Sequence, residues 1–519
     1  MAEDSPAPAL AGGETEPEAV PLRDAVLSGS FFGAGHAAAA ARLGDFTQGG
    51  GTPGDRLRAW FGEAADRLVA GGTDAIRAAL DRDIAAIDAL LGEQLDAILH
   101  AERLQALEGR WRGLAWLVRG VEPGRRVKVR VLSIAWSEIC RDLERALEFD
   151  QSRLFRWIYE EEFGIAGGEP FGLMVIDHPL RHRPSPAAPT DDVGAMLRLS
   201  SIAAAAFCPM VLSLHPSVLE VDSFAQLDSV QDVTAPLKGP MHARWRGLST
   251  RPDMRFLAVA MPRLLARHPW ADDPARTDGF RYREFAPDAS GRCWMSAAYA
   301  FAASALRAYA SFAWPADIRG VETDRVGGGL VTDVAPEPFA SGPPLAWSRT
   351  GLELRLGDRQ ERALVEAGLM PVSALPYCAE MVFGAVRSLQ MPATHAGGNA
   401  AAADASARLS SQVNSILCAS RFAHYLKVMG RDMVGSFQTA DAIERRLSIW
   451  LQGYVNTNLA STGESRARYP LVAGEVQVRE RAGQPGVFSC VVRLQPHYQL
   501  DDVATSFSLV TELTASGGR

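Results

Sequence analysis

The sequence predicts an α/β (α+β) protein, in which a mixed-sheet α/β body follows N-terminal helices and precedes a C-terminal unit of helices and strands. Three observations carry this prediction. Apolar residues recur at helical spacing near the N-terminus, buried-strand patterns alternate with helical ones in the middle, and period-two segments close the chain. The 519 residues also exceed the roughly 250–300 that one hydrophobic core supports, so we expect several folding units.

The first part of the chain is predicted to be a tail followed by helices. Residues 1–54 are rich in Ala, Gly, Pro and acidic residues, which favours a flexible N-terminal tail. An apolar island at 27–32 is available there to pair with a partner. Residues 55–119 form an N-terminal helical region, because apolar residues recur every three or four positions, most regularly over 76–98.

Residues 120–370 are assigned to the α/β body. Aliphatic residues alternate with charged ones, or form short apolar runs, in five predicted strands: 126–132, 171–176, 209–214, 256–261 and 352–356. Helical spacing predicts three helices between them: 137–163, 193–206 and 358–367. Strands and helices in alternation indicate helices packed on a sheet.

Residues 371–519 are assigned to the C-terminal unit. Two long helical patterns come first, at 400–435 and 441–454. Three alternating segments then predict strands at 475–480, 487–495 and 504–512. We expect the last strand near a domain edge.

Composition restricts the functional class. The net charge of -8 argues against general binding to nucleic acid, which needs a concentrated basic surface. No apolar stretch approaches the roughly 20 residues that cross a bilayer, and no secretion signal begins the chain, so we predict a cytoplasmic protein without membrane insertion. The six scattered cysteines contain no CxxC pair and are predicted to be buried, reduced thiols.

Searches for a reactive site predict no catalytic, cofactor-binding or metal-binding residues. The chain has no GxxxxGK[ST] phosphate loop, no HExxH pair and no GxSxG nucleophile elbow. His178 and His182 have the spacing of metal ligands on a helix, but Pro179 and Pro184 favour a loop instead. The acidic run at 160–162 is interpreted as a solvated, salt-bridged helix face.

One polar cluster remains after these searches. Its members lie mostly three to four residues apart on the predicted helix 400–435, and they are Arg421, His424, Lys427, Arg431 and Asp432. Such a cluster forms either a buried polar network or a contact with another subunit. The apolar stripe around His424 favours the network, and both interpretations remain open.

Many segments of the chain resemble the large sheath subunit of type VI secretion, the TssC, VipB or ImpC family. The similar segments, in the family's order, are LDAILH (95–100), LEGRWRG (107–113), RALEFDQS (145–152), IYEEEFG (158–164), GEPFG (168–172), DSF (222–224), AVAMPR (258–263), IRGVE (318–322), DRQE (358–361), SRFAHYLK (420–427), RD (431–432), GSF (435–437), ARYPL (467–471) and LQPHYQL (494–500). Two departures, residues 1–55 without a counterpart and an insertion at 323–326, suit a specialised paralogue.

The resemblance implies a phage-tail-sheath-like fold and a structural role without cofactors. It implies these partners: the small sheath subunit (TssB or VipA), other sheath protomers, the Hcp inner tube, the baseplate, and the ClpV ATPase acting on the contracted complex. Open strand edges permit exchange between protomers, so we predict that 504–512, with Phe507 and Leu509, is an exchanged strand. An adaptor-like paralogue that does not polymerise and an enzyme with an unrecognised site are the alternatives.

Overall fold

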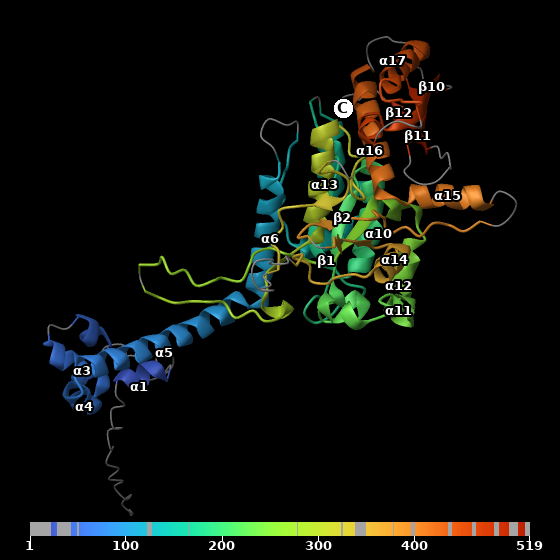
Figure 1. The fold of residues 1–519 in the computed structure, drawn as a ribbon. Coiled ribbons are helices and arrows are strands. Elements are labelled where there is room, and N and C mark those ends of the chain that lie inside the picture. Colours follow the sequence, from blue (N-terminus) through green and yellow to red (C-terminus); the bar gives the residue numbers. More distant parts are fainter. Residues whose placement is uncertain are drawn as a thin grey trace, which may run out of the picture. The chain divides into compact units, whose positions relative to one another are not determined.

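The structure is a computed structural model that describes most of the chain. The described residues are 22–28, 43–48, 51–121, 127–165, 167–277, 279–322, 325–337, 349–376, 378–395, 400–433, 439–458, 463–481, 487–497 and 507–513. The chain divides into two compact units (Figure 1). Unit 1 comprises Met1–Ala101 and Pro269–Ala286, and unit 2 comprises Glu102–His268 and Pro287–Arg519.

Unit 1 is built mainly from helices, drawn in blue in Figure 1. They are α1 (Leu22–Leu27), α3 (Pro53–Phe61), α4 (Ala64–Ala70) and α5 (Thr73–Leu99). A small apolar core includes Leu22 and Trp60. Beside it, the carboxylate of Asp83 accepts hydrogen bonds from the Trp60 indole and the Arg23 guanidinium, both at 2.8 Å. These bonds satisfy the charge of an otherwise buried carboxylate.

The predicted flexible tail over 1–54 is wrong for three of its parts. Residues 22–28 and 43–48 are largely helical, and Leu22 is only 2% exposed. A helix of six residues shows too little of the 3.6-residue period to stand out in an Ala-rich and Gly-rich stretch. Residues 51–54 are also described, and helix α3 begins at Pro53. Residues 1–21, 29–42 and 49–50, which include 29–32 of the apolar island, lie outside the described residues.

Unit 2 contains a four-stranded parallel sheet in the order β1-β2-β3-β7. The strands are β1 (Met174–Leu180), β2 (Met210–Leu214), β3 (Leu257–Met261) and β7 (Met370–Pro371). The α/β body is thus confirmed, and antiparallel pairing occurs in the smaller sheets around it. Every residue of β2 and β3 is buried, as expected for the centre of a parallel sheet.

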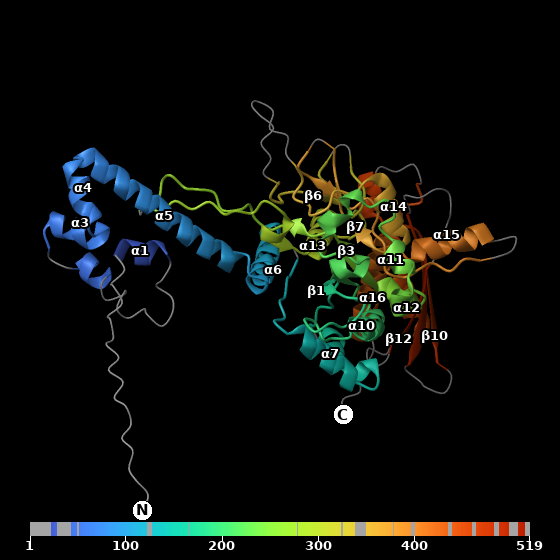
Figure 2. The same ribbon diagram turned by 90° about the horizontal axis from the view of Figure 1, so that it is seen from below.

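Helices cover both faces of this sheet (Figures 1 and 2). Helix α10 (Asp192–Ala206) packs against Leu212 of β2 in one hydrophobic cluster. Helix α13 (Ala297–Phe312) packs against Val211 and Ala258 in another. Successive residues of a strand face opposite sides, so the two helices lie on opposite faces.

Other elements before residue 400 surround the sheet. The helices are α6 (Glu102–Arg119), α7 (Trp136–Arg145), α8 (Arg153–Phe155), α9 (Glu161–Phe163), α11 (Ala235–Lys238), α12 (Ala243–Ser249) and α14 (Asp358–Glu366). The short strands are β4 (Leu264–Leu265), β5 (Trp294–Met295), β6 (Leu330–Val331), β8 (Ser373–Ala374) and β9 (Met381–Val382). Strand β4 pairs with β5, and β6, β9 and β8 form a three-stranded sheet.

The C-terminal part of unit 2 combines helices with an antiparallel sheet. The helices are α15 (Ala400–Ser410), α16 (Val413–Met433), α17 (Ala440–Gln452) and α18 (Gly463–Arg468). The strands β10 (Leu471–Glu480), β11 (Phe488–Pro496) and β12 (Phe507–Leu513) form a sheet in that order. The residues buried between them include Phe422, Leu447 and Val492. Strand β12 lies at the edge of this sheet.

Two predicted strands of the body are wrong. Residues 127–132 form no strand and are mostly exposed, while 126 lies outside the described residues. Residues 352–356 also form no regular strand: Leu352 makes a single bridge to Leu264, and the side chain of Glu353 turns inward to Arg263. In both segments the alternating pattern reflects ion pairs rather than a strand with one buried face.

Two predicted long helices are interrupted. The helix expected over 137–163 ends at Arg145, and a new helical stretch begins where the Asp142 carboxylate accepts the amides of Arg153 and Leu154, both at 3.2 Å. The helix expected over 400–435 breaks after Ser410, where the carbonyl of Ser411 accepts both the amide and the hydroxyl of Ser388. The first break depends on the Asp142 side chain and the second on Ser388, so helical periodicity alone does not reveal them.

Candidate assembly interface

The predicted polar cluster lies on α16, beginning with His424. This side chain is 1% exposed, and its Nε2 atom lies 3.2 Å from the carbonyl oxygen of Ala206. Burial lowers the pKa of His424 to about 3, and the nearby Arg421 charge acts in the same direction. The imidazole is therefore neutral at physiological pH and donates a structural hydrogen bond to the end of α10.

Lys427 lies one turn further along α16, among aromatic rings. Its ammonium group lies 4.8 Å from the ring centroids of both Tyr159 and Phe207, and 5.5 Å from that of Phe163. It also donates a hydrogen bond of 3.1 Å to the Tyr159 hydroxyl. The ring faces compensate part of the lost hydration, so the cation can join α16 to the body.

Arg421 occupies the preceding turn of the same helix. Its guanidinium lies 4.6 Å from the ring centroid of Tyr425 and 5.7 Å from that of Tyr309 on α13. One of its nitrogens donates to the carbonyl oxygen of Pro170 at 3.4 Å. Arg421 thus links three segments of unit 2 that are far apart in the sequence.

Arg431 and Asp432 complete the cluster near the C-terminal end of α16. Arg431 Nη1 donates to the carbonyl oxygens of Phe163 and Ile165 at 3.1 and 2.9 Å. Asp432 pairs with Arg431 at 3.2 Å, and its side chain remains 65% exposed. The structure therefore brings the four basic members into contacts within unit 2 and leaves the acidic one facing outward.

The aromatic partners of this cluster were not identified from the sequence. Tyr159 and Phe163 lie on a helical stretch that includes a π-turn (Arg156–Glu160), and Tyr309 lies on α13. Helical spacing within 158–164 and 420–427 predicts that each segment is a helix with these side chains on its surface. Only the fold shows that the two halves meet.

The other predicted interface residues, Phe507 and Leu509, belong to β12. This strand pairs antiparallel with β11, placing Phe507 opposite Leu494 and Leu509 opposite Val492. The side chains of β12 lie outside the described part of the chain. The backbone places both residues on a strand at the edge of its sheet, where a further strand could be added.

A buried ion pair joins three segments at the edge of the body. The Glu353 side chain is fully buried and accepts two hydrogen bonds of 2.6 Å from Arg263. The Ser223 hydroxyl and the Phe224 amide also donate to it, at 2.7 and 3.1 Å. Segments 222–224 and 258–263, which are separate in the sequence, therefore meet at one carboxylate.

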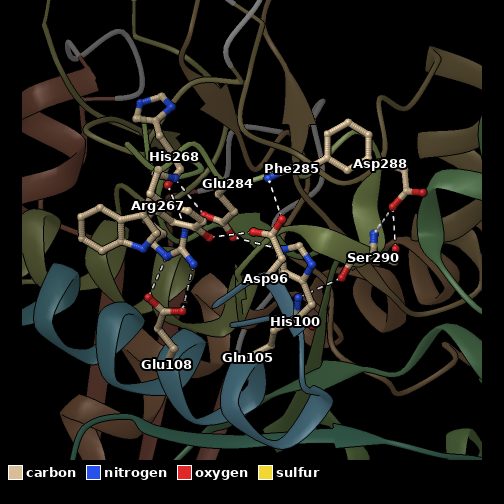
Figure 3. Close-up of polar contacts among 12 residues, drawn as sticks. Asp96, His100, Gln105, Glu108, Arg267, His268, Glu284, Phe285, Asp288 and Ser290 are labelled. Carbon is tan, nitrogen blue, oxygen red and sulfur yellow. Dashed lines mark hydrogen bonds and ion pairs between the residues drawn. The ribbon is translucent and has the colours of Figure 1, made fainter. Parts of the chain in front are cut away.

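Figure 3 shows how the segment around 267–290 is attached within each unit. In unit 1, Glu284 accepts the Trp270 amide at 2.8 Å and lies 3.2 Å from His100 Nε2. In unit 2, Arg267 donates to Glu108 at 2.7 and 3.3 Å. Burial acts to raise the pKa of Glu108, but hydrogen bonds from Arg267 and Arg112 outweigh it, and the pKa is lowered.

The two histidines weighed as metal ligands have separate environments. His178 lies on β1, stacks on Trp136 and pairs with Asp192 at 3.1 Å. His182 follows β1 and stacks on His242 with ring centroids 4.1 Å apart. Across the described ranges, no group of three or more His, Cys, Asp or Glu side chains is placed to hold a metal ion.

The acidic run at 160–162 is only partly a solvated face. Glu160 pairs with Arg156 at 3.4 Å on the surface. Glu162 is buried instead, where it contacts the Arg130 guanidinium and accepts the Glu169 amide at 2.8 Å. The six cysteines are free thiols and all but Cys378 are buried, as predicted. Among the described residues, no helix has both the length and the apolarity to cross a bilayer.

Comparison with known proteins matches most of the chain to tail sheath proteins. Residues 81–390 match the family described as "EvpB/VC_A0108, tail sheath N-terminal domain". Residues 402–513 match "EvpB/VC_A0108, tail sheath gpW/gp25-like domain". The chain is 34% identical over 448 residues to the type VI secretion system sheath protein TssC1 of Pseudomonas aeruginosa strain PAO1, covering 85% of this chain and 87% of that protein.

Proposed function

We propose a function from the premise that this chain belongs to the VipB family of tail sheath proteins. The chain is a structural large subunit of a type VI secretion sheath. The observation that carries this conclusion is the match of both tail sheath domains together with similarity over nearly the whole length of TssC1. The partners of this subunit, its strand exchange and its cellular location are proposed from that role.

The first proposal is a heterodimer with the small sheath subunit, TssB or VipA, that polymerises around the Hcp tube in the cytoplasm. Polymerisation needs a contact that repeats without closing into a ring. The edge strand β12 suits such a contact, because its free side can receive a strand from a neighbouring protomer. We propose that β12, with Phe507 and Leu509, takes part in strand exchange between protomers through this edge.

The second proposal concerns the polar cluster on α16. Arg421, His424 and Lys427 make their described contacts within unit 2, which supports a role in fixing α16 on the body. Asp432 is exposed, which supports a contact with another chain. We propose that the cluster transmits movement between the C-terminal sheet and the body when protomers repack.

Contraction is proposed to use energy stored in the extended lattice and released as protomers repack, without a catalytic step in this chain. The baseplate is a further proposed partner, and the ClpV ATPase would act on the contracted complex. The neutral, hydrogen-bonded state of His424 supports a structural role over acid–base work.

Co-expression with the small sheath subunit tests this function. The proposal predicts co-purification of the two chains and hollow tubules in negative-stain electron micrographs. A heterodimer that never forms tubules would favour a specialised paralogue. A chain that remains a monomer beside the small subunit would contradict the proposal.

A further inference from the structure

The two edges of the C-terminal sheet differ from each other. Strand β10 forms one edge and β12 the other, with β11 between them. Within the described ranges β12 pairs only with β11, so its far side is open. The far side of β10 is covered instead, by side chains of α17 and by the turn that follows this helix. Figure 1 shows α17 beside β10.

Two side chains of α17 form hydrogen bonds with the backbone of β10. The Glu444 carboxylate accepts the amide of Val478 at 2.8 Å. The side-chain amide of Gln452 donates to the carbonyl oxygen of Gly474 at 2.9 Å. Backbone amides and carbonyls on the outer side of an edge strand are the groups that an added strand would use. Both side chains of α17 therefore occupy places of a neighbouring strand.

The first residue of β10 is covered by the main chain after α17. The Leu471 amide donates to the carbonyl oxygen of Tyr454 at 3.2 Å, and the Leu471 carbonyl oxygen accepts the amide of Asn456 at 2.8 Å. These two bonds form a short parallel bridge between 455 and 471. The covering of the β10 edge therefore begins at its first residue and continues along α17.

The spacing of α17 matches the spacing of β10. Glu444 and Gln452 are separated by eight residues, or about 12 Å of helix. Their partners Val478 and Gly474 are separated by four residues, or about 13 Å of strand. A Cβ atom on Gly474 would lie 2.7 Å from Cδ2 of Leu451, so a glycine at this position permits the close approach of α17. The helix therefore fits the strand edge at two points.

Alternation along β10 shows that these bonds lie on its outer side. The Arg481 amide donates to the carbonyl oxygen of Val487 at 2.8 Å, just beyond the paired ends of β10 and β11. Because backbone groups alternate in an antiparallel pair, odd-numbered residues of β10 face β11 and even-numbered ones face away. Gly474 and Val478 belong to the even-numbered set.

The same alternation identifies the free groups of β12. Cys490 of β11 lies opposite Val478 on one side and opposite Thr511 on the other. Since the backbone of Val478 faces away from β11, that of Cys490 faces β12 and bonds Thr511. Odd-numbered residues of β12 thus face β11. The amides of Ser508 and Val510 face the open side.

We propose that α17 closes the β10 edge against β12 of a second copy, so that strands add to the C-terminal sheet only at β12. Strands β10 and β12 run in the same direction, since each is antiparallel to β11. A second copy displaced sideways could therefore continue the sheet by placing its β12 beside an open β10. Such a contact does not close on itself and would repeat from copy to copy.

The chemistry of the cover suits this role. An arriving strand would have to displace the Val478 amide from the Glu444 carboxylate, and bonds to an ionised acceptor are stronger than those between neutral groups. It would also bring its own backbone against that charge, and charges at sheet edges oppose pairing. This inference rests on the proposed function for the use of β12 in strand exchange. It adds that the chain offers one edge for exchange.

Variants of the full chain, studied without the small sheath subunit, test the proposal. Glu444→Ala with Gln452→Ala removes both bonds from α17 to β10, so self-association measured by sedimentation velocity should strengthen at least about ten-fold. Glu444→Gln with Gln452→Lys is the matched control, because it keeps an acceptor for the Val478 amide and a donor for the Gly474 carbonyl. The control should associate within about three-fold of the wild-type chain.

A third variant identifies the strand that occupies the opened edge. Val510→Pro, added to the alanine pair, removes a donor from the open side of β12 and keeps the bonds to β11. Self-association should then return to within about three-fold of the wild-type value. In the alanine pair itself, hydrogen exchange at the amides of Ser508 and Val510 should slow at least about ten-fold as the chain associates.

Three results would overturn the proposal. The first is an alanine pair that keeps its melting temperature and associates no more strongly than the wild-type chain. The second is association that persists after Val510→Pro, because it would come from another surface or from unfolding. For a pair that loses its fold, Gln452→Ala alone gives the third: this exposed side chain covers half of the edge, and unchanged self-association would contradict the cover.

Failure of the proposed function gives a different result. If tubules with the small subunit do not depend on β12, the proposed strand exchange at that edge is wrong. The self-association of the alanine pair is measured on the chain alone, so it still reports whether α17 closes β10.

Discussion

The Nζ atom of Lys427 donates a hydrogen bond of 3.1 Å to the hydroxyl of Tyr159, 268 residues earlier in the chain. This contact joins α16 to the helical stretch that precedes β1. It is one of several bonds, with those of Arg421 and Arg431, through which the C-terminal helices are attached to the α/β body.

Replacing Lys427 with methionine should destabilise the protein by about 1–2 kcal/mol, because the variant loses a desolvated cation–π contact and a hydrogen bond. Thermal unfolding of the full chain, followed by circular dichroism, measures the loss. Lys238→Met is the control: its ammonium forms an exposed pair with Asp232 at 3.0 Å, and exposed pairs contribute little to stability. Equal losses in the two variants would contradict the importance of the aromatic environment.

His424 should make stability depend on pH. Its pKa is about 3 in the folded protein and about 6.5 in an unfolded chain, so the unfolded state binds one more proton between these values. The buried, neutral imidazole therefore contributes its full stabilisation of the folded protein above pH 6.5, and this stabilisation is lost progressively as the pH falls toward 3. His182 and His215, whose pKa values burial lowers to about 4, act in the same direction.

Replacing His424 with glutamine removes this titration. The difference from the wild-type protein then measures how much His424 contributes to the pH dependence of stability. The slope of unfolding free energy against pH, measured between pH 4 and 6, should fall by up to about 1.4 kcal/mol per pH unit. His395→Gln serves as the control, because that side chain is exposed and pairs with Asp404 on the surface. An unchanged slope in the His424 variant would show that the imidazole is protonated in the folded state.

The pair of Arg263 and Glu353 should behave as a unit. Arg263→Met leaves a buried carboxylate without its counter-charge, so we expect a loss of about 3–5 kcal/mol. Adding Glu353→Met should restore part of that loss, because neither charge then remains buried. A double-mutant cycle measures the coupling, and additive losses would argue against a direct interaction.

Gly109 should not tolerate a side chain. A Cβ atom there would lie 2.0 Å from the carbonyl oxygen of Trp294, so α6 would have to move away from β5. Gly109→Ala should cost roughly 1–3 kcal/mol, as overpacking does. Gly92→Ala, also within a helix, has its nearest atom at 3.7 Å and should be neutral or stabilising by up to about 1 kcal/mol. Chemical denaturation compares the two.

Patterns that one segment carries alone predicted much of the fold. The apolar runs of β2 and β3 and the helical period of α5 need no distant partner to be recognised. Helix α13 was missed because it is buried on most sides and Ala-rich, so it shows little amphipathic pattern. The break at Ser411 and the inward turn of Glu353 depend on Ser388 and Arg263, which only the fold brings near.

The candidate site was predictable in part. Helical spacing placed Arg421, His424 and Lys427 on one side of a helix. It could not supply Tyr159 or Ala206, which belong to other segments. Segment 127–132 was mistaken for a strand because its basic residues alternate with aliphatic ones, although Lys128 and Arg130 form ion pairs with Glu169 and Glu162.

Electron microscopy of the full chain co-expressed with the small sheath subunit tests the central claim most directly. The account predicts long hollow tubules for the wild-type pair, and their loss in Phe507→Pro with Leu509→Pro, while the melting temperature of the body remains. Unaltered tubules in that variant would contradict the proposed strand exchange. A wild-type pair that forms neither heterodimers nor tubules would contradict the sheath function itself.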